Sequence, residues 1–137
     1  YIPVLNLAFW VSGQIFIDRR SRVQSIRAMS RLMEKVRRNK RSMHVAPEGT
    51  RSPDGEIQSF KKGAFHIAIQ SRFPMHILVV CGAWELMPPG RFYAKPGVIR
   101  IRHLPPIDTS EWKRESITEH MEMVRSRMVE TYGTMRE

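Results

Sequence analysis

The stretch KGAFHIAIQSRFPMHILVVC, residues 62–81, contains the two patterns that most directly indicate the fold class of this chain. Residues 62–71 are interpreted as a helix, and residues 76–81 as a strand that begins after Pro74. A short strand that is apolar throughout is typical of a parallel sheet whose two faces are both covered. We therefore expect an α/β fold.

Further elements are predicted on the N-terminal side of this stretch. Residues 14–18 indicate a short strand, and residues 21–38 indicate a helix because their apolar side chains recur at helical spacing. Residues 43–46 are interpreted as another strand, which leads into a turn-rich loop at Pro47. The alternation of strands and helices predicts a mostly parallel sheet flanked by helices.

Two elements are predicted on the C-terminal side. Residues 98–103 place two isoleucines on one face and two arginines on the other, which indicates a half-exposed strand near a sheet edge. Ser116 and Glu119 have the spacing of a capping box, and apolar residues follow at helical spacing. The chain should therefore end in an amphipathic helix, whose methionine-rich stripe we expect to pack in the core.

Length and composition fit a single domain. The chain has 137 residues, 42% of them hydrophobic, and it begins at Tyr1 without a methionine, so we expect part of one N-terminally truncated domain. The apolar run at residues 1–11 is about half the length that crosses a bilayer, so neither a transmembrane helix nor a signal peptide is expected there. The lone Cys81 lies in an apolar run, which predicts a buried thiol in a reducing compartment.

The net charge of +10 is concentrated in one segment. Between Arg19 and Arg41 there are ten basic residues and one acidic residue, Glu34. Such a patch attracts nucleic acid, anionic lipid headgroups or phosphorylated small molecules, and charge alone does not choose among them. No known nucleic-acid-reading motif accompanies it, and aromatic residues do not alternate with the basic ones.

Three segments combine charged residues with turn formers. They are Gly13-Gln-Ile-Phe-Ile-Asp-Arg19, Pro47-Glu-Gly-Thr-Arg51 and Phe73-Pro-Met-His-Ile-Leu-Val79. The first two end in an arginine just after a predicted strand, at the edge where open α/β sheets bind ligands. Gly49 allows a close backbone approach, and a guanidinium can bind phosphate through two hydrogen bonds. Arg19 and Arg51 are thus candidates for a shared phosphate site.

The order and spacing of these segments resemble the PlsC-type glycerophosphate acyltransferases. The likeness continues through Phe60-Lys-Lys-Gly-Ala-Phe65 and Leu104-Pro-Pro-Ile-Asp108, so it covers most of the chain. The resemblance implies acyl transfer from acyl-CoA or acyl carrier protein to the hydroxyl of lysophosphatidate in phospholipid biosynthesis. It further implies association with the cytoplasmic face of an anionic membrane, no nucleic-acid partner, and no metal or other cofactor.

The same resemblance assigns roles to individual residues. Residues 1–137 would form the acceptor-binding and C-terminal part of the domain, and the catalytic His-x4-Asp motif would precede Tyr1. Binding of the acceptor phosphate and glycerol is assigned to Arg19, Glu48, Gly49, Thr50 and Arg51. Supporting positions are Gly13, Phe16, Asp18, Pro47 and Pro74. The fragment itself is expected to be inactive.

Some features depart from the family pattern. Ala46 replaces the usual phenylalanine before Pro-Glu-Gly, and Ile77 replaces the second proline of the fourth motif, which affects pocket shape more than reaction type. His103 and Asp108 have the literal His-x4-Asp spacing, but two prolines lie between them and exclude a helical presentation. A non-catalytic module that binds anionic phospholipid or nucleic acid is the alternative function.

Overall fold

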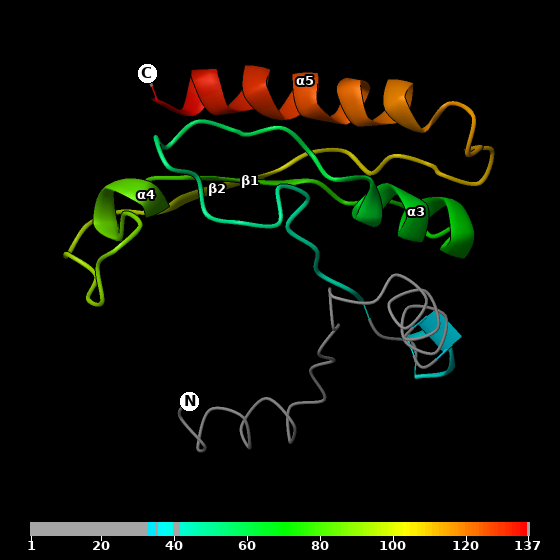
Figure 1. The fold of residues 1–137 in the computed structure, drawn as a ribbon, viewed down its shortest axis with the longest axis horizontal. Helices are drawn as coiled ribbons and strands as arrows, with labels where there is room; N and C mark the ends of the chain where they lie inside the picture. The colour runs from blue at the N-terminus through cyan, green and yellow to red at the C-terminus, as the bar shows by residue number, and fades with distance from the viewer. Residues whose placement is uncertain (1–32, 35, 40–41, 137) are drawn as a thin grey trace. The chain divides into compact units, whose positions relative to one another are not determined.

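The computed structural model describes residues 33–34, 36–39 and 42–136 (Figure 1). The chain divides into two compact units, Tyr1–His44 and Val45–Glu137. In the first unit, residues 33–34 and 36–38 are helical and Asn39 lies in a turn, which confirms the predicted end of the helix at residues 21–38. The rest of that helix and the predicted strand at residues 14–18 lie outside the described residues.

The second unit contains the elements that position the candidate site. In chain order they are α3 (Lys62–Ser71), β1 (Leu78–Cys81), the short helix α4 (Ala83–Leu86), β2 (Arg100–His103) and α5 (Ile117–Arg136). In Figure 1, α5 runs alongside the two strands, and it packs against both β1 and α3. The helices predicted at residues 62–71 and near the C-terminus are confirmed.

The two described strands pair antiparallel, with Leu78 opposite His103 and Cys81 opposite Arg100. A bridge between Met75 and Ile107 continues the pairing beyond the strands. The connection from β1 to β2 contains only the four-residue α4, which is too short to cross over a sheet and bring the chain back in parallel. The predicted mostly parallel sheet is therefore not confirmed in the described part of the chain.

Residues 43–46 form no strand, so the strand predicted there is wrong. Their backbone makes no ladder with another described segment, and three of these four residues are exposed. The segment runs directly into the turn at Pro47. A short apolar run specifies a strand only when a partner strand satisfies its backbone groups.

The core of this unit lies between β1 and the helices. In β1, Val79 and Cys81 are buried, while Leu78 and Val80 are 45% and 44% exposed on the opposite face. The apolar character of the strand therefore does not mean that both faces are covered. The half-exposed edge strand predicted at residues 98–103 is present as β2, but all four of its residues are exposed, with Ile101 at 65%, so it is more exposed than expected.

Both long helices bury an apolar stripe in this core. Phe65 of α3 is 1% exposed and stacks with Trp112 at a centroid distance of 6.2 Å. The stripe predicted for α5 is confirmed as core, because Ile117, Val124 and Tyr132 are buried. Cys81 is a free, buried thiol, as expected. Hydrophobic burial, at roughly 25 cal/mol per Å² of apolar surface, is thus the main source of stability of this unit.

Two glycines give opposite stability predictions. Gly133 lies inside α5 with open space where a Cβ would be, so Gly133→Ala should raise the free energy of unfolding by about 0.5–1 kcal/mol. Gly82 has φ +94, and a Cβ there would lie 2.4 Å from the Val98 carbonyl oxygen. Gly82→Ala should therefore lower the unfolding free energy by at least about 2 kcal/mol. Urea unfolding followed by circular dichroism measures the unfolding free energy of both variants. Equal changes would contradict the different surroundings assigned to Gly133 and Gly82.

Candidate functional site

The Pro-Glu-Gly-Thr-Arg segment is the first part of a loop, residues 47–61, which is here called the motif loop. Its two ends are joined because the Lys61 N–H donates to the Pro47 carbonyl at 2.8 Å. Near the same end, Oε1 of Glu48 accepts a hydrogen bond from the Gln58 N–H at 3.0 Å. The Glu48 carboxylate therefore spans the loop and fixes its two sides at a constant separation.

Gly49 forms the tight turn that follows Glu48. Its φ is +72, a conformation that side chains with a Cβ rarely adopt, and its N–H donates to the Ala46 carbonyl at 3.2 Å. A Cβ at this position would lie 3.0–3.2 Å from the end of the Lys61 side chain. The glycine is thus required by its backbone conformation, whereas the end of the flexible Lys61 side chain could shift to admit a Cβ.

Lys61 is a site residue that the sequence interpretation missed. Its ammonium nitrogen would lie 3.1 Å from a Cβ at Gly49, so its positive charge is close to the turn that presents Thr50 and Arg51. The sequence offered one signal, its place in the Phe60-Lys-Lys-Gly segment that carries the family resemblance. Nothing in the sequence indicated that this lysine folds back onto residue 49.

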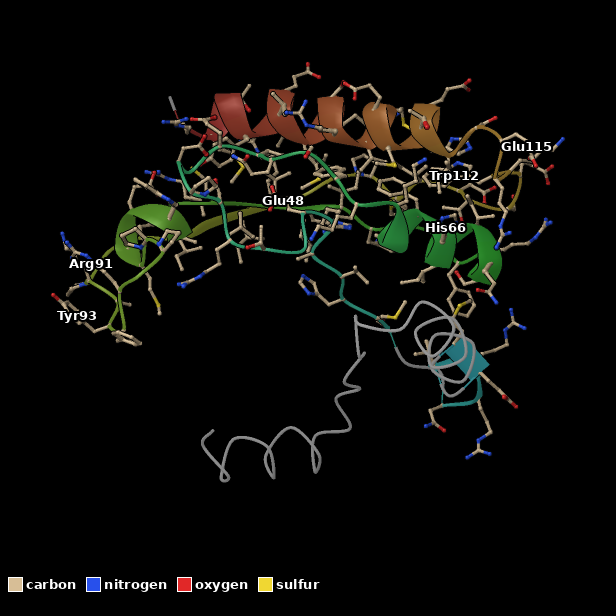
Figure 2. The ribbon with its side chains drawn as sticks, in the orientation of Figure 1. Glu48, His66, Arg91, Tyr93, Trp112 and Glu115 are labelled. Carbon is tan, nitrogen blue, oxygen red and sulfur yellow. The ribbon has the colours of Figure 1, made fainter. Side chains whose placement is uncertain are left out.

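Thr50 and Arg51 are exposed at the outer side of the turn, as a ligand-binding role requires. Glu48 and Gly49 behind them are half-buried, and Figure 2 labels Glu48 within the motif loop. A guanidinium is planar and always charged, and its donors match the geometry of a phosphate. The arrangement can therefore present a positive, hydrogen-bonding surface to an anion.

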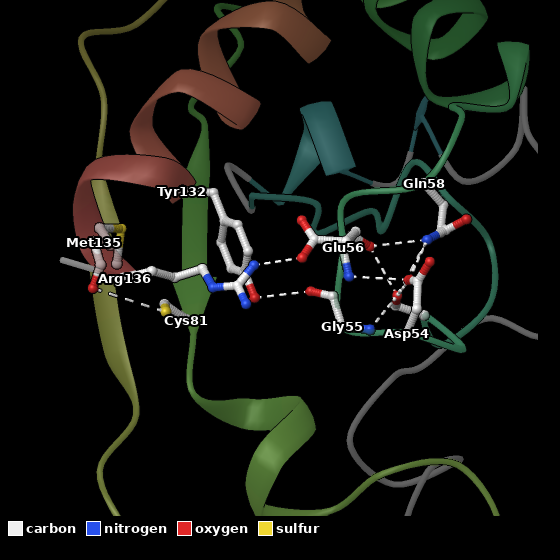
Figure 3. A network of polar contacts seen from close by, with 9 residues as sticks. Asp54, Gly55, Glu56, Gln58, Cys81, Tyr132, Met135 and Arg136 are labelled. Atoms are coloured by element: carbon white, nitrogen blue, oxygen red, sulfur yellow. Dashed lines mark hydrogen bonds and ion pairs between the residues drawn. The ribbon is translucent and has the colours of Figure 1, made fainter.

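A network of polar contacts stiffens the loop beyond Arg51 (Figure 3). Oδ1 of Asp54 accepts hydrogen bonds from the Glu56 N–H at 3.0 Å and from Nε2 of Gln58 at 2.7 Å. The Ser52 hydroxyl oxygen lies 2.8 Å from the same Asp54 oxygen and accepts from the Gly55 N–H at 3.0 Å. These bonds satisfy backbone groups that would otherwise compete for other partners.

Helix α5 holds the motif loop from behind. Arg125 donates to the carbonyls of Ile57 and Gln58 at 3.2 and 3.3 Å. The Tyr132 hydroxyl donates to the Gly55 carbonyl at 2.8 Å, as Figure 3 shows. Arg136 forms an ion pair with Glu56, but both side chains are about half exposed, so solvent screens this pair and it contributes little.

The pKa shifts of the site have local causes. The backbone N–H of Glu56, with help from Ser52, lowers the pKa of the Asp54 carboxyl below its ordinary value. Burial raises the pKa of the Tyr132 hydroxyl. The tyrosine thus stays protonated and able to donate to Gly55 throughout the neutral pH range.

The other residues predicted for the site are only partly described. Gly13, Phe16, Asp18 and Arg19 lie outside the described residues, so the pairing of Arg19 with Arg51 stays a prediction. Pro47 closes the motif loop through its carbonyl, which accepts from the Lys61 N–H. Pro74 is an exposed residue between the end of α3 and the Met75 bridge, where it separates helix from strand.

His103 and Asp108 each have a different partner. Nε2 of His103 lies 3.0 Å from Nδ1 of His76, and the two rings stack. The Asp108 carboxylate accepts hydrogen bonds from the backbone and hydroxyl of Ser110, both at 2.9 Å, and these bonds lower its pKa. These contacts agree with the interpretation of the spacing as coincidental.

The described residues contain neither a candidate membrane span nor a candidate metal centre. None of the helices in this part of the chain has the length and hydropathy that a membrane span needs. Among the same residues, no cluster of three or more His, Cys, Asp or Glu side chains could hold a metal ion.

Comparison with known proteins identifies the class. The family model described as "Acyltransferase" matches residues 1–81, which is more than half of the chain. The chain therefore belongs to the acyltransferase family. The fold agrees, since the crystal structure of the 1-acyl-sn-glycerophosphate acyltransferase PlsC from Thermotoga maritima matches with a TM-score of 0.74 and 31% identity. That match covers 95% of this chain and 52% of the other.

Curated relatives make the likeness more specific. The 1-acyl-sn-glycerol-3-phosphate acyltransferase of Saccharomyces cerevisiae is 38% identical over 133 residues, which is 96% of this chain and 44% of the yeast protein. The 1-acyl-sn-glycerol-3-phosphate acyltransferase alpha of Mus musculus is 32% identical over 125 residues, with 90% and 44% covered. The chain thus spans less than half the length of these relatives.

The contacts from α5 predict a stability effect on the motif loop. Arg125→Met removes both donors to the loop carbonyls and should lower the unfolding free energy by about 1–3 kcal/mol. Hydrogen exchange of the Gln58 and Lys61 amides should become faster in this variant. Arg127→Met, which changes an exposed arginine on the same helix, should stay within about 0.5 kcal/mol. Equal effects of the two variants would refute the support role of Arg125.

The lowered pKa of Asp54 predicts acid sensitivity. A carboxyl whose pKa is lower in the folded than in the unfolded state stabilises the fold above the unfolded value, and this contribution is lost as the pH falls through the folded value. Asp54→Asn should therefore reduce the unfolding free energy at neutral pH and flatten its decline in the acid range. Urea unfolding at a series of pH values measures this, and parallel curves for the two proteins would contradict it.

Proposed function

We propose that this chain is the acceptor-binding and C-terminal part of an enzyme of phospholipid biosynthesis. The reaction is transfer of an acyl group from acyl-CoA or acyl carrier protein to the free hydroxyl of 1-acylglycerol-3-phosphate. The observation that carries the proposal is the closed motif loop, which presents the exposed Arg51 from a turn fixed by Glu48 and Gly49. The names of the yeast and mouse relatives support it.

The proposed chemistry needs one base and accurate positioning. The acceptor oxygen attacks the thioester carbonyl, an ester C–O bond forms, and the C–S bond breaks. A histidine of the His-x4-Asp type takes the hydroxyl proton and passes it to the leaving thiolate. In this proposal the histidine is not one of residues 1–137, so the chain by itself has no acyl-transfer activity. Its contribution is to hold the acceptor, which converts a random encounter into a directed one.

In this proposal each residue of the motif loop has a distinct task. Arg51 binds the acceptor phosphate through its guanidinium, and Lys61 adds positive charge to the same turn. Thr50 faces the glycerol portion of the acceptor. Glu48 acts on the shape of the pocket through its hydrogen bond to Gln58 rather than through contact with the phosphate, which a carboxylate would repel.

Several wider expectations remain proposals of the same kind. One is that Arg19 is a second phosphate ligand. Another is that the complete fold contains a mostly parallel sheet. We also propose that the protein associates with the cytoplasmic face of a membrane, with the ten basic residues between Arg19 and Arg41 attracted to anionic lipid. No metal or other cofactor is required by the proposed chemistry.

Substitution of Arg51 tests the proposal directly. In an enzyme that contains this chain together with a His-x4-Asp region, Arg51→Ala should lower kcat/KM for lysophosphatidate at least tenfold, which corresponds to about 1.4 kcal/mol of transition-state binding. The reason is the loss of the phosphate ligand. Transfer of a radiolabelled acyl group measures the rate at several acceptor concentrations.

Two further variants make this test specific. Arg51→Lys retains the charge without the paired donors and should recover part of the lost rate. Arg114→Ala removes another exposed arginine, outside the motif loop, and should leave kcat/KM unchanged. An unchanged rate in Arg51→Ala would overturn the phosphate assignment.

A further inference from the structure

The connection between α4 and β2 carries an unusually exposed pair of aromatic residues. This segment, residues 87–99, is here called the α4–β2 loop. Phe92 is 99% exposed and Tyr93 is 68% exposed. An apolar ring left fully in water loses the free energy that burial would supply, roughly 1.5–3 kcal/mol for a side chain of this size. Its position therefore requires an explanation.

The exposure of Phe92 does not come from a loose loop. The Lys95 N–H donates to the Leu86 carbonyl at 2.9 Å, and the Arg91 N–H donates to the Pro88 carbonyl at 3.3 Å. These bonds close the base of the loop and form a turn before the aromatic pair. Three prolines, Pro88, Pro89 and Pro96, further restrict the backbone. The fold thus holds the two rings outward.

The surroundings of the aromatic pair are positively charged. From residue 86 to residue 107 the sequence contains no aspartate or glutamate, and it contains four basic residues, Arg91, Lys95, Arg100 and Arg102. All four are exposed. The Arg91 guanidinium lies 6.0 Å from the centre of the Tyr93 ring, which places a cation beside the aromatic surface.

Within the second unit, the loop lies at the opposite end from α3. Figure 1 shows it beside α4, at the end of the sheet away from α3 and extending away from α5. In Figure 2, the labels of Arg91 and Tyr93 stand at this end, whereas Trp112 and Glu115 are at the other. The nearby sheet face that α5 does not cover also exposes apolar residues, because Val80 and its partner Ile101 are 44% and 65% exposed.

We propose that the α4–β2 loop docks on an anionic lipid bilayer, with Phe92 and Tyr93 entering the headgroup region. Aromatic side chains favour this region because their rings are apolar while a hydroxyl such as that of Tyr93 stays hydrated. Exposed basic residues that outnumber the acidic ones complement anionic headgroups at short range, and Glu85 of α4 is the one acidic residue from α4 to β2. A protein partner is less favoured by the residues, since the other four of the five charged residues in this stretch are basic.

The biological role of this surface depends on the proposed function, because an enzyme that acts on lysophosphatidate must reach it in a membrane. The surface consists of other residues than the basic ones between Arg19 and Arg41, which the sequence suggested for the same partner. Binding to vesicles does not require acyl transfer. Its failure would leave the role assigned to Arg51 intact, and failure of that role would leave vesicle binding intact.

Flotation with phosphatidylcholine vesicles that contain about 30% phosphatidate tests the proposal. The double variant Phe92→Ala, Tyr93→Ala should lower the partition coefficient at least tenfold at constant salt. The double variant Arg91→Gln, Lys95→Gln should lower the partition coefficient on anionic vesicles by a similar factor. At about 0.5 M salt its partition coefficient should come closer to that of the unchanged chain. Two control variants should keep a partition coefficient within about twofold of that of the unchanged chain. They are Val129→Ala, at an exposed apolar position on α5, and the double variant Lys113→Gln, Arg114→Gln.

A spectroscopic measurement locates the contact. Phe92→Trp should add fluorescence that brominated phosphatidylcholine in the same vesicles quenches, whereas Val129→Trp should add fluorescence that it does not quench. Thermal unfolding by circular dichroism checks that each variant is folded, which is expected because Phe92 is almost fully exposed. Unchanged partitioning of the aromatic variant, or no quenching at position 92, would overturn the proposal.

Discussion

The candidate site depends on the hydrogen bonds that α5 donates to the motif loop. Arg125 and Tyr132 satisfy three loop carbonyls from positions 67 to 77 residues later in the chain. A long surface loop without such partners would leave its backbone groups to water and sample many conformations. The presentation of Arg51 is therefore a consequence of how α5 packs, although Arg51 and α5 are far apart in sequence.

The packing of α5 depends in turn on the apolar core. Val124 and Tyr132 bury one stripe of the helix against β1 and α3, and the polar contacts extend from the same side of the helix to the loop. Tyr132 combines both functions, because its ring is buried while its hydroxyl reaches Gly55. Core packing and site geometry are thus coupled through one side chain.

The two faces of the small sheet differ in how far they are covered. One face of the small sheet is covered by helix, and the other exposes Leu78, Val80 and Ile101. The residues proposed to bind substrate or lipid lie in the motif loop and the α4–β2 loop, where their exposed side chains take no part in the core. Residues that act on a ligand can therefore differ from those that hold the fold, with Gly49 and Tyr132 as the points where the two requirements meet.

The sequence by itself determined the local elements and the motifs. The bounds of α3, the stripe of α5 and the position of β1 followed from apolar spacing and from Pro74, because these signals act over a few residues. The residues of the motif loop were likewise recognisable by their order. Only the tertiary structure decided that β1 and β2 pair antiparallel, that residues 43–46 form no strand, and that Lys61 lies over Gly49. Each of these depends on which distant segments satisfy backbone hydrogen bonds or fill space, and that choice is made by the whole fold rather than by local spacing.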